Sequence, residues 1–210
     1  MSRKPLWIAA VCVLVYFFTN GMALFVPQNL FPRFMETFGA TPAEVSRTTA
    51  ITFGISGLLA PFVGAAIDRF GVVRVIRTGL LVLGITFIAY PMARSLQDLY
   101  LLHAVIAVGL ILSGLMPNVV LLSRWFRERR GMAVGVLVAG SSLAGATLPV
   151  AIYRFLGQPG ALHKVEVRFV VVHGCFAFPS SSLRLIAFVR RYPDALISSP
   201  NPNAWRTSPA

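Results

Sequence analysis

Acidic side chains are scarce in this sequence. Its 210 residues include 7 Asp and Glu against 19 Lys and Arg, so the formal net charge is +12. In a soluble protein that excess would suggest a nucleic-acid partner, but here the arginines fall between long apolar runs and not on a surface interleaved with aromatic residues. We therefore expect no nucleic-acid partner.

Cysteine and histidine are also rare, and this excludes several kinds of site. The two cysteines, Cys12 and Cys175, lie far apart with no CxxC or histidine-rich spacing around either. Neither a disulfide framework nor a metal site is indicated. No Ser/His/Asp set or carboxylate pair shares a plausible site, so we expect neither an enzyme nor a cofactor.

Apolar residues dominate what remains. The composition is 56% hydrophobic and 12% charged, with a mean hydropathy of +0.74, and no soluble domain of this length could hide that much apolar surface. A helix needs about 20 apolar residues to cross the hydrocarbon of a bilayer. Five stretches without Asp or Glu meet that length and predict an all-α polytopic bundle in a lipid bilayer: residues 6–25, 48–67, 75–93, 99–122 and 131–153.

The basic residues predict the orientation of these spans, because cytoplasmic loops carry an excess of Lys and Arg. Only three basic residues, Arg33, Arg47 and Arg94, fall on the side of the membrane opposite the N-terminus. The side of the N-terminus carries nine: Arg3, Lys4, Arg69, Arg74, Arg77, Arg124, Arg127, Arg129 and Arg130. We therefore expect the N-terminus to be cytoplasmic, in a bacterial-type inner membrane.

Local patterns predict one helix start and several close contacts. Thr41-Pro42-Ala43-Glu44 resembles a capping box with proline at the first helical position, so the second helix should begin before the hydrocarbon does. Small residues four apart let helix backbones approach in lipid. They predict close packing by the second and fifth spans, at Ala60 and Gly64, Gly131 and Gly135, and Gly140 and Ala144.

The stretch "GAAIDRFGVVRVIR", residues 64–77, carries the first family resemblance. Its Gly, Asp-Arg, Gly and Arg spacing resembles the G-x-x-x-D-R-x-G-R-R loop between the second and third helices of the major facilitator superfamily. The chain departs from this pattern at one point: Val72 or Val73 replaces the first basic residue after the glycine, and Arg74 comes later than in the family. Gly71 permits the left-handed conformation that a tight reversal needs. The Asp68 carboxylate can pair with Arg69 or Arg74, or meet the positive N-terminal end of a neighbouring helix. The resemblance implies a latching loop of Gly64, Asp68, Arg69, Gly71 and Arg74.

A second stretch narrows the resemblance. "SRWFRERRGMAVG", from Ser123, is similar to the fourth-to-fifth helix connection of the oxalate/formate antiporter and monocarboxylate transporter branch. Drug/proton antiporters of the superfamily often carry an arginine within the fourth helix, and the fourth span here has none, so the resemblance favours an organic anion over drug efflux. The resemblance covers about residues 6–157 and implies a transporter of a small organic anion. The matching residues are Arg124, Trp125, Phe126, Arg129, Arg130 and Gly131.

The resemblance also implies a central cavity lined mainly by helices one and four. Each polar side chain available there either contacts the substrate or forms a hydrogen bond between helices, and the second role is the more common one for such residues. His103, near the end of the fourth span, is interpreted as an interfacial residue and not as a proton relay. The cavity candidates are Tyr16, Thr19, Asn20, Asn118, Ser141 and Ser142.

Residues 158–210 differ from the rest. Their best apolar run, a poor sixth span, carries Glu166, Arg168, His173 and Arg184, and one charge at mid-bilayer costs about 2.5–3.5 kcal/mol. We expect an out-of-frame or disordered tail after a partial amino-terminal half at 1–157. Three hypotheses remain open: a truncated and inactive transporter fragment that lacks its second half, a half-transporter that forms a homodimer, or a non-transporting protein that binds a full-length relative.

Overall fold

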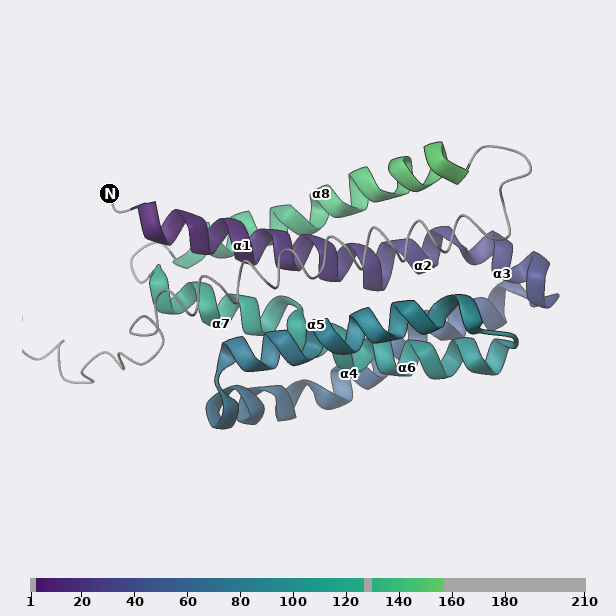
Figure 1. Ribbon diagram of the computed structural model, residues 1–210, viewed down its shortest axis with the longest axis horizontal. Helices are drawn as coiled ribbons and strands as arrows, with labels where there is room; N and C mark the ends of the chain where they lie inside the picture. The colour runs from purple at the N-terminus through teal and green to yellow at the C-terminus, as the bar shows by residue number, and fades with distance from the viewer. Residues whose placement is uncertain (1–2, 127–129, 157–210) are drawn as a thin grey trace, which may run out of the picture.

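The computed structural model describes residues 3–126 and 130–156, and within them every regular element is helical (Figure 1). This confirms the all-α prediction. The tail at 158–210, Arg127 and Arg129 lie outside the described residues. The elements are α1 (Arg3–Asn20), the π-helix η1 (Gly21–Phe25), α2 (Val26–Asn29), α3 (Phe31–Phe38), α4 (Pro42–Phe70), α5 (Val72–Ala89), the 3-10 helix η2 (Tyr90–Met92), α6 (Leu96–Ser113), α7 (Leu115–Trp125) and α8 (Arg130–Leu156).

Within residues 3–126 and 130–156, five helical segments are long and apolar enough to cross a membrane, as the sequence predicts. The α4–α5 turn and the ends of α7 and α8 that face each other lie at the end of the bundle where α1 begins (Figure 1). The α5–α6 connection lies at the opposite end, so successive spans run in opposite directions. The segments are Ala9–Asn29, Pro42–Phe70, Val72–Ala89, Leu96–Arg124 and Arg130–Val150.

Side-chain caps explain where two of the long helices begin. Thr41 and Glu44 form the expected capping box: the Thr41 backbone N–H donates to Glu44 Oε2 at 2.8 Å, and the Glu44 N–H donates to Thr41 Oγ1 at 3.4 Å. Ser95 and Asp98 form a second capping box at α6 that the sequence analysis missed. Each box satisfies N–H groups that a helix start leaves without partners.

Two of the spans are interrupted, although the sequence analysis expected continuous helices. The first span passes from α1 into η1 just before Pro27, and the fourth breaks at Gly114 just before Pro117. Proline cannot donate the backbone hydrogen bond of a regular helix, and π-helical turns and kinks commonly occur beside it. Both interruptions are found in spans that the sequence analysis assigned to a central cavity.

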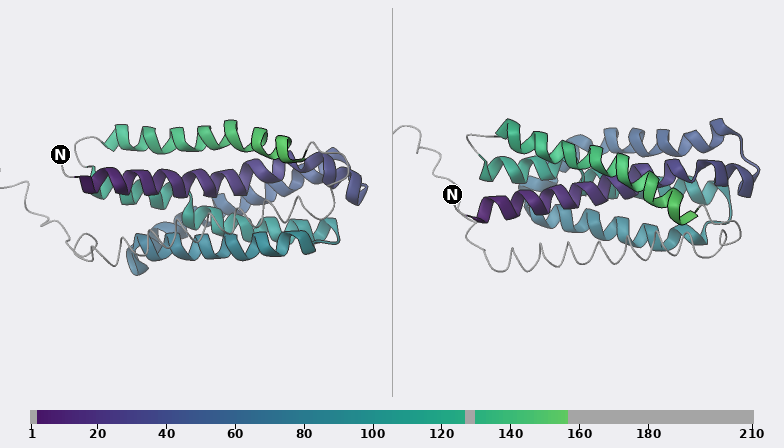
Figure 2. Two further views of the ribbon diagram at one scale, coloured as in Figure 1. Left: turned by 45° about the horizontal axis from the view of Figure 1, so that its top comes forward. Right: turned by 90° about the horizontal axis from the view of Figure 1, so that it is seen from above.

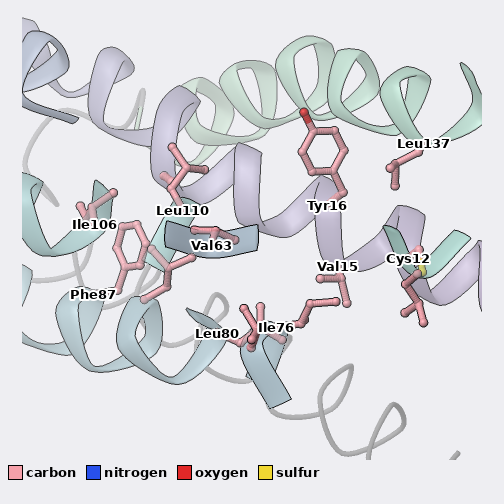
Figure 3. Packing of buried hydrophobic residues seen from close by; sticks show 14 of the residues in the cluster. Cys12, Val15, Tyr16, Val63, Ile76, Leu80, Phe87, Ile106, Leu110 and Leu137 are labelled. Atoms are coloured by element: carbon pink, nitrogen blue, oxygen red, sulfur yellow. The ribbon is translucent and has the colours of Figure 1, made fainter. Parts of the chain in front are cut away.

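The spans pack in two groups joined by α7. Helices α4, α5 and α6 form one group, α1 packs along α8, and α7 contacts both groups (Figure 2). The buried core between them is aliphatic and aromatic, with Val15 from α1, Ile76, Leu80 and Phe87 from α5, and Ile106 from α6 (Figure 3). Close packing here depends on shape because lipid is as apolar as the core.

Small residues do mediate close packing, but only some of the predicted ones. A Cβ added at Gly140 would meet Val13 Cγ1 of α1 at 2.7 Å, and Ala144 is fully buried. Helix α8 therefore packs closely on α1, as expected for one of its two small-residue pairs. Close packing was also predicted at the other two pairs, and among the described residues that prediction was wrong: a Cβ at Gly64, Gly131 or Gly135 would meet nothing within 4 Å.

Candidate functional site

The signature loop occupies the turn between α4 and α5, and Gly71 makes the reversal alone. It ends α4, where its N–H donates to Ile67 O at 2.9 Å, and it begins α5, where its O accepts from the Val75 N–H at 3.2 Å. Its φ of 85° is positive, a conformation that glycine adopts without steric cost. The positive φ agrees with the expectation for Gly71, but its ψ of 142° lies outside the left-handed helical region.

The charged residues of this loop point outward and do not pair with each other. Asp68, Arg69 and Arg74 are exposed, and within the described residues Asp68 forms no ion pair with either arginine. The Arg69 guanidinium lies over the Phe70 ring, 5.5 Å from its centre. Gly64 lies one helical turn before Asp68, with open space beside it. The expected pairing of Asp68 with a nearby arginine is therefore wrong in this structure.

The second motif connects α7 to α8 at the same end of the bundle (Figure 1). Arg124 is exposed, and Trp125 is the last residue of α7. Phe126 leaves the helix and packs partly against the core, while its N–H still bonds Leu122 O at 2.9 Å. Exposed Arg130 and Gly131 begin α8, and Arg129 lies outside the described residues.

Two cavity candidates come together between α1 and α8. The Asn20 Nδ2 group donates a hydrogen bond to Ser141 Oγ across 121 positions of sequence. Both side chains are partly buried, and Asn20 directly precedes the π-helix η1. A π-helical turn changes the direction in which helix side chains and carbonyls point, and such turns are frequent at functional sites. Asn20, Ser141 and η1 therefore form the polar centre of the α1–α8 contact.

The other candidates on α1 and α8 lie in different environments. Tyr16 is buried and its ring points from α1 toward α8 (Figure 3). Thr19 is fully buried, and its hydroxyl has no hydrogen-bond partner among the described residues. Ser142 is exposed. Of the two adjacent serines, only Ser141 belongs to the polar centre.

Asn118 repairs the interruption of the fourth span. Its Nδ2 group donates to Ser113 O at 2.8 Å and to Gly114 O at 2.7 Å. Pro117 has no N–H to offer the Ser113 carbonyl four residues earlier, so the Asn118 amide replaces the missing backbone donor. Asn118 Oδ1 is buried and has no partner within the described chain. This bonding gives Asn118 a structural role that the cavity interpretation did not include.

His103, interpreted from the sequence as an interfacial residue near the end of the fourth span, lies inside the bundle. The residue is only 2% exposed and lies between α4, α6 and η2. Its Nδ1 lies 3.0 Å from Thr52 Oγ1 and its Nε2 lies 3.1 Å from the Tyr90 hydroxyl. Thr52 lies 51 positions and Tyr90 13 positions from His103 in the sequence, and all three belong to different elements, so no helical spacing pattern indicated this contact.

Comparison with known proteins agrees with this architecture. The chain is 26% identical over 157 residues to human monocarboxylate transporter 10, a match that covers 70% of this chain and 30% of the relative. It is 29% identical over 127 residues to rat monocarboxylate transporter 4 (60% and 26%), and 28% identical over 120 residues to an MFS-type transporter of Gibberella moniliformis (57% and 29%). The matched region thus spans less than a third of each of these relatives.

The match to a protein family is more extensive than the match to any of these relatives. The family model described as Major Facilitator Superfamily matches residues 9–207, which includes all five membrane-spanning segments. Five apolar helices together with this match identify a multi-pass integral membrane protein. The chain therefore belongs to the Major Facilitator Superfamily.

Proposed function

We propose that this chain is part of a secondary transporter that carries a small organic anion, such as a monocarboxylate or an oxalate- or formate-like carboxylate, by alternating access. The observation that carries the proposal is the Asn20–Ser141 contact beside the π-helix of the first span. Interrupted membrane helices with polar groups at the break are the usual construction of a transporter's binding site. The relatives named monocarboxylate transporters support the anion class.

The chemistry of this polar centre suits one part of a carboxylate site. Asn20 retains an amide oxygen and a second N–H, and Ser141 retains its own O–H, which can donate to an anion. These groups are neutral, so the positive charge that an anion requires has to come from elsewhere in the assembled transporter. We propose that a second half or a second copy of the chain supplies it.

Exchange of anions is the proposed mode, which makes the transporter an antiporter and not an enzyme. The proposed orientation has a cytoplasmic N-terminus in a plasma membrane, because the order of spans along the sequence puts nine basic residues on the side of the N-terminus and three on the other side. The sequence alone favoured a bacterial-type inner membrane. The relatives named above come from mammals and a fungus, and they give that assignment no support.

Adjacent serines provide the matched test. We would measure binding of radiolabelled lactate and oxalate to the purified chain in lipid nanodiscs, for the wild type, Ser141→Leu and Ser142→Leu. Leucine at 141 removes the Oγ partner of Asn20 and fills the polar centre, so binding should fall about tenfold or more. Leucine at exposed position 142 should leave binding unchanged.

The outcomes separate the proposal from a non-transporting role. An organic-anion site would be supported if binding is saturable and is reduced by other small carboxylates but not by the neutral lactamide. Equal loss in the two serine variants would show that the α1–α8 contact is not the site. If neither carboxylate binds saturably, the chain alone is not an anion carrier, and co-purification with a full-length relative would then favour the regulatory alternative.

A further inference from the structure

His103 joins three elements of the bundle through its two ring nitrogens. It extends from α6 into the interior, where one ring nitrogen meets Thr52 of α4 and the other meets Tyr90 of η2. It lies seven residues into α6, about 10 Å from the start of that helix. One buried side chain therefore connects the second, third and fourth spans near the end of the bundle opposite the signature loop (Figure 1).

Hydrogen-bond accounting assigns the protons of this cluster. A threonine hydroxyl has one hydrogen, and three acceptors lie within reach of the Thr52 hydroxyl: Thr48 O at 3.0 Å, His103 O at 3.4 Å and, in one tautomer, His103 Nδ1 at 3.0 Å. We assign the hydrogen to a backbone carbonyl, so that Thr52 Oγ1 accepts from His103 Nδ1–H, because the other tautomer would leave the Tyr90 hydroxyl without an acceptor. The bare Nε2 can only accept, so the Tyr90 hydroxyl donates to it. The neutral ring thus satisfies every polar atom of the cluster, and the tautomer follows from this network.

A protonated ring cannot keep this arrangement. With hydrogens on both nitrogens, Nε2 becomes a donor and the Tyr90 O–H loses its acceptor. Tyr90 is itself buried and is surrounded by rings, with Phe34 and Phe87 centred 6.1 Å and 5.9 Å away. A buried hydroxyl without an acceptor and a buried charge without a counter-ion are both unfavourable. Protonation therefore opposes the contact that holds the three spans together.

Among the residues that the structure describes, no charged side chain is found in contact with the His103 ring. Within the described residues, the recorded polar partners of the His103 ring are Thr52 and Tyr90 alone. Helix α3, which touches Tyr90 through Phe34, contributes Arg33 and Glu36 to the surroundings. The other charged or titratable groups of α6 and of the described elements packed against it are Arg3, Lys4, Cys12 and Tyr16 on α1, Glu44, Arg47, Asp68 and Arg69 on α4, Arg74 and Arg77 on α5, Asp98 and Tyr100 on α6, and Arg124 on α7.

We propose that His103 is a protonation-sensitive lock that fastens α4 and η2 to α6 while its ring is neutral and releases them when the ring is protonated. Two further bonds flank it along the same α4–α6 contact: the Tyr100 hydroxyl donates to Glu44 O at 2.9 Å, and Ser56 Oγ donates to Ala107 O at 3.2 Å. The lock lies between them, so its release loosens the middle of that contact. This regulation is independent of which anion the transporter carries.

Thermal unfolding of the full chain in detergent tests the lock. An unperturbed histidine titrates near pH 6.5, and the fold binds the neutral ring, so stability is present above that pH and falls below it. We expect the wild-type Tm to drop by about 3 °C or more between about pH 7.5 and about pH 5. His103→Gln cannot titrate and should show no such drop. The matched control, His163→Gln with His173→Gln, removes the other two of the three histidines and should retain it.

A second variant keeps the proposal testable if His103→Gln fails to fold. Tyr90→Phe removes the donor that favours the neutral ring, so its Tm should depend less on pH than that of the wild type. Hydrogen exchange gives a local readout: amides near Thr52 and His103 should lose protection at acid pH in the wild type, after correction for the intrinsic exchange rate. A pH-independent wild type, or an undiminished drop in His103→Gln or in Tyr90→Phe, would overturn the proposal.

Discussion

At the scale of single residues, Asn118 shows how a polar side chain in a membrane helix can serve the backbone. Its amide supplies the hydrogen bond that Pro117 cannot make to Ser113 O. We predict that Asn118→Ala lowers the free energy of unfolding in detergent by about 1–3 kcal/mol, because two carbonyls in the interior lose their donor. Chemical denaturation followed by circular dichroism measures this.

Two controls separate this role from a general intolerance of substitution. Asn29 also donates to a backbone carbonyl four residues earlier, Phe25 O, but it is exposed, so Asn29→Ala should change stability by less than about 0.5 kcal/mol. Pro117→Ala restores a backbone N–H beside Asn118. The double variant should therefore be more stable than Asn118→Ala alone, and a strictly additive loss would contradict the repair role.

At the scale of helices, α5 and α6 approach each other closely at Gly79. A Cβ added at Gly79 would lie 2.7 Å from the Ser113 backbone nitrogen and 2.8 Å from the Leu112 carbonyl carbon, and backbone atoms cannot move aside as a side chain can. Gly79→Ala should cost about 1–3 kcal/mol of unfolding free energy from overpacking. On the same helix, a Cβ at Gly84 would meet nothing within 4 Å. Gly84→Ala should be neutral or slightly stabilising, and equal losses at both positions in thermal unfolding would contradict this packing.

The limits of prediction are also clearest at this scale. The lengths of the apolar runs predicted the five spans, and Thr41-Pro42-Ala43-Glu44 predicted the start of α4, because both signals are local. The contact of Gly79 was missed because its partner lies more than thirty residues away and no four-residue spacing marks it. The Asn20–Ser141 pair was predicted only as two separate candidates. Tertiary contact between helices, and not local pattern, decides which small and polar residues meet.

At the scale of the whole molecule, α4 and α8 carry apolar faces that the other described helices leave uncovered. Phe53, Leu58 and Phe62 of α4 and Val136 of α8 are more than half exposed, in a bundle whose other three spans are more deeply buried. Lipid alone can cover such faces, but Gly131 and Gly135 also leave open space along α8, where another helix could approach closely.

Helix α8 therefore offers a test of self-association. With Cys12 and Cys175 replaced by serine, we predict that Gly135→Cys forms a disulfide between copies in oxidised membranes, because its open face can meet the same face of a second chain. Gly140→Cys is the matched control on the same helix, since that position packs against Val13 of α1 and should not cross-link. Dimer on non-reducing electrophoresis for Gly135→Cys alone would support a homodimer. Monomer for both variants would leave the proposed second half as the source of the missing positive charge, whereas equal dimer for both would show that α8 does not pack on α1.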